Sequence, residues 1–208
     1  MDTETTGLEG HPIDRVLEIG IAEYNEDTGD ITPLYSEVIR YDDIESFDSR
    51  YVNSDGSKGI WVYRHSDLRI EDTLNAEKDI DTVVREVREM VNGRDATSYN
   101  IAFDFFRFLM TDPWFIRCRI PMDIMDLATE RVYELADSDS VSDKILQRKL
   151  LKKREDHPHD SKWVSATDAY RVLCPDDPMG KGKRMHRALD DAVMEGWILR
   201  ALSAQNSK

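Results

Sequence analysis

The sequence predicts an α/β protein in which helices flank a mixed central β-sheet. Short β-branched segments alternate along the chain with segments of helical periodicity, and the first two strand candidates are separated by only a short turn. Because hairpin strands are antiparallel and strands joined through helices are commonly parallel, this combination indicates a mixed sheet. The length of 208 residues suits one domain, which we assign to residues 1–208.

The first quarter of the chain predicts a β-hairpin followed by a loop. Residues 16–24 are apolar and β-branched, residues 26–30 contain turn-forming side chains, and residues 34–39 belong to an alternating segment. Residues 40–60 are polar, and within them we expect an exposed loop at residues 53–57.

The rest of the chain predicts helices and one further strand. Apolar side chains recur at helical spacing in residues 79–91, and residues 96–99 form a short strand candidate. A helix is expected to start just after Asn100, and another to carry the apolar side chains of residues 188–197. Residues 130–162 change in character and are predicted to be a charged helical insertion.

The charge of −14, from 28 Lys plus Arg against 42 Asp plus Glu, argues against a wide basic face that tracks a phosphate backbone. Any nucleic acid must therefore be held locally. The basic run at residues 147–154 indicates either a solvated helix face or a contact with phosphates.

The two cysteines, Cys118 and Cys174, suggest neither a disulfide framework nor a zinc site. No apolar run approaches membrane-spanning length, so we expect a cytoplasmic protein without a membrane partner.

Three separate segments carry carboxylates that suit a metal site. Asp2 and Glu4 are two residues apart, so on an extended backbone both project from one face. Asp104 lies between two phenylalanines, where a carboxylate is costly to bury without a cation. His186 and Asp191 lie near the start of the last helix. Taken alone, each of these residues is explained by surface exposure, by helix capping or by an interaction with the helix dipole. Together they are the groups that two-metal phosphodiester hydrolysis requires.

These residues occur in three motifs that resemble those of the DEDDh, or DnaQ-like, 3′→5′ exonucleases. The family includes polymerase proofreading subunits, RNase T and oligoribonuclease. The matching segments stand in the family's order and cover the chain except for residues 130–162; they are Asp2-Thr3-Glu4-Thr5-Thr6-Gly7-Leu8, Asn100-x-x-Phe103-Asp104 and His186-x-Ala188-Leu189-x-Asp191-Ala192.

The resemblance implies a ribonuclease-H-like fold and removal of nucleoside 5′-monophosphates from the 3′ end of DNA or RNA. It implies that two Mg²⁺ or Mn²⁺ ions are held by Asp2, Glu4, Asp104 and Asp191. It also assigns His186 as the general base. The residues expected to contact the terminal nucleotide are Thr5, Leu8, Asn100 and Phe103. In family members a hydrophobic strand runs into the first Asp, whereas only Met1 precedes Asp2 here. We therefore expect a truncated first strand, with the true start upstream or the chain a truncated product.

The expected partner is a single-stranded or frayed 3′ end, because the terminal base must be unstacked to enter a pocket. The motifs leave DNA and RNA equally open. The basic segment at residues 181–184 is either a phosphate contact or a solvated loop. Two alternatives remain: a non-catalytic exonuclease-like module that binds a polymerase or another replication or repair complex, and an unrelated acidic protein with accidental motifs.

Overall fold

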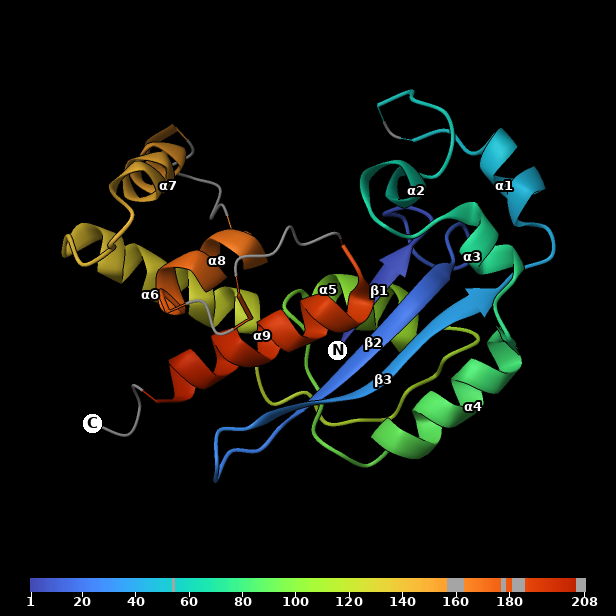
Figure 1. The fold of residues 1–208 in the computed structure, drawn as a ribbon, viewed down its shortest axis with the longest axis horizontal. Coiled ribbons are helices and arrows are strands. Elements are labelled where there is room, and N and C mark those ends of the chain that lie inside the picture. The colour runs from blue at the N-terminus through green and yellow to red at the C-terminus, as the bar shows by residue number, and fades with distance from the viewer. Residues whose placement is uncertain (54, 157–162, 177–178, 181–185, 205–208) are drawn as a thin grey trace.

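A mixed β-sheet lies at the centre of the structure, with helices on both sides (Figure 1). The computed structural model describes residues 1–53, 55–156, 163–176, 179–180 and 186–204. Within this part of the chain the sheet has the order β1-β2-β3-β4, and its strands are β1 (Asp2–Thr5), β2 (Val16–Tyr24), β3 (Ile31–Arg40) and β4 (Lys78–Asp79). The first three strands are antiparallel, and β4 pairs with β3 in parallel.

The predicted hairpin is confirmed as β2 and β3. Most of β2 is buried, and its turn is closed by a bond from the Asn25 amide to the Asp30 carbonyl at 2.9 Å. The Asn25 side chain accepts from the amides of Asp27 and Thr28 at 2.9 and 3.0 Å. Turn-forming side chains therefore fix the register that buries one strand against the core.

Helices fill the rest of the described chain. The helices before residue 110 are α1 (Ile44–Arg50), α2 (Trp61–His65), α3 (Ile70–Leu74), α4 (Ile80–Val91), α5 (Ile101–Phe103) and the π-helix η1 (Asp104–Leu109). They are followed by α6 (Ile124–Asp137), α7 (Lys144–Asp156), α8 (Ala166–Leu173) and α9 (Ala188–Ser203). In the described residues, no helix is long and apolar enough to cross a membrane.

One sequence prediction about local structure is confirmed and another is wrong. The loop expected at residues 53–57 is confirmed for its described residues, and the polar stretch before it contains α1, which packs Ile44 and Phe47 in an apolar cluster. The strand expected at residues 96–99 is not formed, and an isolated bridge from Asp95 to Arg119 lies just before this segment. Within the expected loop, Ser54 lies outside the described residues.

The helix α9 connects two parts of the core. It packs on β1, β2 and β3 and also contacts α6 and α8 (Figure 1). The helices α6, α7 and α8 share one apolar cluster with the far part of α9, while α4 and η1 pack with the sheet. Residues 130–156 of the predicted insertion form the second half of α6 and all of α7, and residues 157–162 lie outside the described part.

Candidate functional site

Strand β1 places Asp2 and Glu4 on one face, as the sequence predicts. Thr3 and Thr5 alternate with them and are buried on the other face, whereas Asp2 and Glu4 are half-buried. The burial of the two threonines thus fixes the direction in which the two carboxylates project.

The start of α9 lies against β2 at Gly20. A Cβ atom at Gly20 would lie 2.2 Å from the Ala188 carbonyl carbon and 2.3 Å from the Leu189 nitrogen, so the backbones approach as closely as a glycine allows. Gly20 is paired with Asp2 of β1. This contact therefore brings the first turn of α9 next to the carboxylates of β1.

Glu4, His186 and Asp191 form the centre of the candidate site. Each offers one ligand atom, and these three atoms all lie within 4.8 Å of one another. His186 precedes α9, is exposed and has a φ of 47°, a left-handed conformation that is uncommon for residues other than glycine. The structure thus brings together residues that are more than 180 positions apart in the sequence.

Asp104 connects η1 to β1 through Thr3. Its side chain is nearly inaccessible to solvent, and Oδ1 accepts from the Thr3 amide at 3.1 Å and from Thr3 Oγ1 at 2.7 Å. Burial raises the pKa of Asp104 to about 6, although the bonds from Thr3 act in the opposite direction. Asp104 is outside the group of three ligand atoms, and its charge acts on Asp2.

The carboxylates raise one another's pKa values in addition to the effect of burial. Burial first, and the charge of Asp191 second, raise the pKa of Glu4 to about 8. The pKa of Asp2 is raised well above its usual range by burial and then by the charges of Asp104, Glu195, Asp191 and Glu4. Carboxylate oxygens that repel one another are ligands suited to a hard divalent cation, whose charge offsets the repulsion. The side chains present therefore fit Mg²⁺ or Mn²⁺.

Glu195 is a further buried carboxylate that the sequence analysis missed. It lies one turn after Asp191 on α9, is only 3% exposed, and has a pKa raised by burial to about 8. The amino group of Met1 is its nearest cation, at 3.6 Å from Oε2. The i, i+4 spacing from Asp191 was the available signal, because it places both side chains on one helix face.

An ion pair fixes the segment between His186 and α9. The Arg187 guanidinium donates to both oxygens of Glu18 at 2.7 to 3.0 Å, and the Ala188 amide donates to the same carboxylate at 3.3 Å. Glu18 is fully buried in β2. Since a buried carboxylate needs its cation, this pair holds the start of α9 on the sheet.

The four residues predicted to bind the terminal nucleotide have different surroundings. Thr5 donates its hydroxyl to the Gly7 carbonyl at 2.7 Å, and the Asn100 side chain accepts from the Phe103 amide as the N-cap of α5. The Phe103 ring packs edge-on against Phe108 at 5.3 Å. Leu8 differs from these three, because 64% of its surface is exposed. Leu8 is thus the predicted contact that is most accessible to a ligand.

Trp61, which lies beside His186, and His65, which stacks on Trp61, were not assigned to the site from the sequence. The Trp61 ring contacts the His186 ring edge-on at 5.9 Å and stacks on His65 at 4.3 Å. Trp61 is 44% exposed. An exposed tryptophan is the signal that points to this position, since large aromatic side chains are commonly buried.

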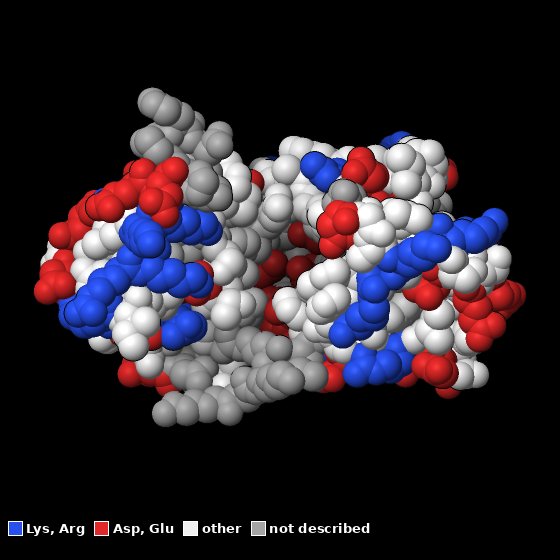
Figure 2. Space-filling model, turned by 90° about the horizontal axis from the view of Figure 1, so that it is seen from above, with Lys and Arg blue, Asp and Glu red and all other residues white. Residues whose placement is uncertain are grey.

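Acidic side chains lie at the bottom of a hollow in the molecular surface. Figure 2 shows acidic side chains on its floor, between the flank that contains α6, α7 and α8 and the flank that contains α1, α2 and α3. The end of β1 and the start of α9 lie between these two groups of helices in Figure 1. The basic segment at residues 181–184 lies outside the described residues.

No family model, curated protein or solved structure matches this chain. The class of the site is therefore defined by its chemistry. It is an acidic hollow that combines a histidine with carboxylates from a strand, a π-helix and a C-terminal helix, and such a donor set suits divalent cations.

Proposed function

We propose that this chain is a metal-dependent 3′→5′ exonuclease of the DEDDh type. It removes nucleoside 5′-monophosphates from the 3′ end of DNA or RNA by phosphodiester hydrolysis. The observation that carries the proposal is the approach of Glu4, His186 and Asp191 within 4.8 Å of one another. Asp2 and Asp104 add two carboxylates whose charges act on the same group.

Each residue has a defined part in this reaction. Asp2, Glu4, Asp104 and Asp191 hold two Mg²⁺ or Mn²⁺ ions, which when bound activate water and stabilise charge on the leaving oxygen. Asp104 also holds the Thr3 backbone, so it positions the strand that carries Asp2 and Glu4. His186 is exposed beside Glu4 and Asp191, where its imidazole accepts the proton of the attacking water.

The proposed fold is ribonuclease-H-like. Three antiparallel strands begin the chain, a C-terminal helix crosses them, and the carboxylates lie where this helix starts. These features support the assignment. In the described sheet β1 pairs only with β2. Asp95, in a separate segment of the chain, forms an isolated parallel bridge with Arg119.

The proposed substrate is a single-stranded or frayed 3′ end. Exposed Trp61 contacts His186 and offers aromatic surface to an unstacked base, and exposed Leu8, a few residues after Glu4, offers apolar surface. The negative floor is compatible with a phosphate only when cations are bound, so substrate binding should depend on metal. We further propose that such ends are presented by a polymerase or another replication complex.

The test is hydrolysis of DNA and RNA strands labelled at the 5′ end. Wild-type protein should give a descending ladder with Mg²⁺ and intact strands with a chelator. Asp104→Asn, Asp104→Ala and His186→Ala should each lose at least about two orders of magnitude in rate, as expected for groups that act in the reaction. Full activity in a folded variant of either residue, or cleavage that persists in chelator, would overturn the proposal.

A further inference from the structure

The basic side chains of α7 fall into two groups. Four are engaged in the described structure: Lys144 with Asp139, Lys149 with Asp168, Lys153 with the Trp163 carbonyl, and Arg154 with Asp137. Arg148 and Lys152 are exposed and form no ion pair or hydrogen bond with any described residue. They are four positions apart, so they lie on the same face of the helix.

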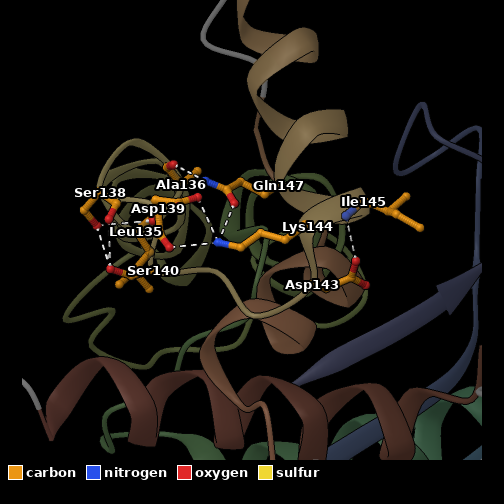
Figure 3. A network of polar contacts seen from close by, with 9 residues as sticks. All are labelled: Leu135, Ala136, Ser138, Asp139, Ser140, Asp143, Lys144, Ile145 and Gln147. Carbon is orange, nitrogen blue, oxygen red and sulfur yellow. Dashed lines mark hydrogen bonds and ion pairs between the residues drawn. The ribbon is translucent and has the colours of Figure 1, made fainter.

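The orientation of α7 is fixed by contacts on its other faces. Leu146 and Leu150 are buried in the apolar cluster shared with α6, α8 and α9. At the start of the helix, Lys144 Nζ donates to Asp139 Oδ1 at 2.8 Å and Gln147 Nε2 donates to the Ala136 carbonyl at 2.6 Å (Figure 3). The exposed pair is therefore held in a defined direction.

The helix α7 lies on one flank of the acidic hollow. Figure 2 shows Lys and Arg gathered on this flank, on the same face of the molecule as the hollow. Basic side chains also occur on the opposite flank, where Arg50, Arg64 and Arg69 donate to backbone carbonyls of their own segments and Lys58 is a single exposed cation rather than a pair one helical turn apart. The two cations of α7 thus remain available to a ligand.

We propose that Arg148 and Lys152 bind the phosphodiester backbone of the single strand whose 3′ end occupies the acidic hollow. This inference rests on the proposed function. Two cations about one helical turn apart match the negative charges that recur along a nucleic acid backbone. On a chain with a net charge of −14, such a local pair is the kind of contact that can hold a strand.

The position of the pair specifies the length of the substrate. Acidic side chains form the floor of the hollow, whereas α7 belongs to its flank (Figure 2). On this proposal, a strand that leaves the hollow over this flank contacts the pair, and a dinucleotide held at the floor is too short to do so. The enzyme should therefore prefer polynucleotides to dinucleotides, and α7 should be the cause.

The test compares two doubly charge-reversed variants. Arg148→Glu with Lys152→Glu removes the proposed contact. Arg85→Glu with Arg117→Glu changes the net charge equally, at two exposed arginines on and beside α4 whose side chains form no hydrogen bond or ion pair with a described residue. The substrates are oligothymidylates of about 20 nucleotides and the thymidine dinucleotide, in Mg²⁺. Circular dichroism verifies that both variants are folded.

We expect the α7 variant to raise KM for the long strand about tenfold and to leave kcat/KM for the dinucleotide unchanged. The slope of log KM against log salt should fall by about 1.4, because two phosphate contacts to a single strand are lost. The α4 variant should behave as wild type. Equal effects of the two variants on the long strand, or an equal loss on both substrates, would overturn the assignment to α7.

A binding measurement separates this inference from the proposed function. Fluorescence anisotropy of the labelled long strand in Ca²⁺, a hard cation that carboxylates bind, needs no hydrolysis. If no variant hydrolyses DNA or RNA but the α7 variant alone weakens binding, the proposed activity fails and the contact stands. If wild type hydrolyses the strand and both variants bind it as tightly as wild type, the contact fails and the activity stands.

Discussion

At the scale of residues, the motif positions were predictable and their surroundings were not. The sequence predicts the direction of Asp2 and Glu4, because strand alternation requires only their spacing. Glu195 could not be recognised in the same way, since a glutamate within a helix commonly faces solvent. Its burial depends on the packing of α9 against β1 and the Tyr99 segment, which no local pattern encodes.

The first prediction uses adjacent aspartates on α9. Asp191 belongs to the group of potential ligands, whereas Asp190 is exposed next to it. Asp191→Asn should weaken Mn²⁺ binding at least tenfold, because it removes one negative ligand, while Asp190→Asn should change it less than twofold. Titration calorimetry at fixed pH measures both. Similar Mn²⁺ affinities in the two variants would exclude Asp191 as a ligand.

At the scale of elements, the long periodic segments were predicted best. The helix expected at residues 79–91 is observed as α4, and Asn100 is the N-cap of α5 as expected. The helix α1 was missed because Ile44 is its single fully buried side chain, too weak a signal for periodicity. The close packing of α9 on β2 could not be predicted from the sequence either, since it depends on the absence of a side chain at Gly20.

The second prediction concerns this contact. Gly20→Ala should destabilise the protein by about 1–3 kcal/mol, because its Cβ meets backbone atoms of α9 that cannot move independently. The shifted helix should also weaken Mn²⁺ binding. Gly196→Ala on the same helix is the control, since its Cβ meets only the Ile31 side chain, at 3.0 Å. Urea unfolding compares them, and equal stability of the two variants would contradict the proposed packing constraint.

At the scale of the whole molecule, the site brings β1, near the N-terminus, next to the start of the last helix, α9. The motifs predict that Glu4, Asp104 and Asp191 belong together, but the flanks of helices around them follow from tertiary packing alone. The charge of −14 argued against a wide basic face, and the structure concentrates part of the acidic charge on the floor. The composition therefore argued against a wide basic binding face but did not show where the acidic surface lies.

The third prediction is the effect of pH on stability without metal. Burial raises the pKa of Glu4 and Glu195 to about 8 and that of Asp104 to about 6, so the folded protein keeps protons that the unfolded chain releases near pH 4. Stability in chelator should thus fall as pH rises from about 5 to about 8. Carboxylates with lowered pKa, such as Asp43 and Asp95, are ionised in both states throughout this range.

Added Mg²⁺ should offset this loss, because a bound cation stabilises the ionised carboxylates. The increase in melting temperature on adding Mg²⁺ should therefore be larger near pH 8 than near pH 5. Thermal unfolding followed by circular dichroism in chelator and in Mg²⁺ measures both effects. A melting temperature in chelator that rises steadily over this range would contradict the raised pKa values.

The central claim is that carboxylates from β1, η1 and α9 form one metal centre that receives a 3′ nucleotide. The most direct measurement is anomalous diffraction from crystals grown with Mn²⁺ and a nucleoside 5′-monophosphate. We expect Mn²⁺ peaks contacted by Asp2, Glu4, Asp104 and Asp191, with the phosphate on the metal and His186 beside it. Mn²⁺ bound elsewhere, or a nucleotide outside the acidic hollow, would contradict the claim.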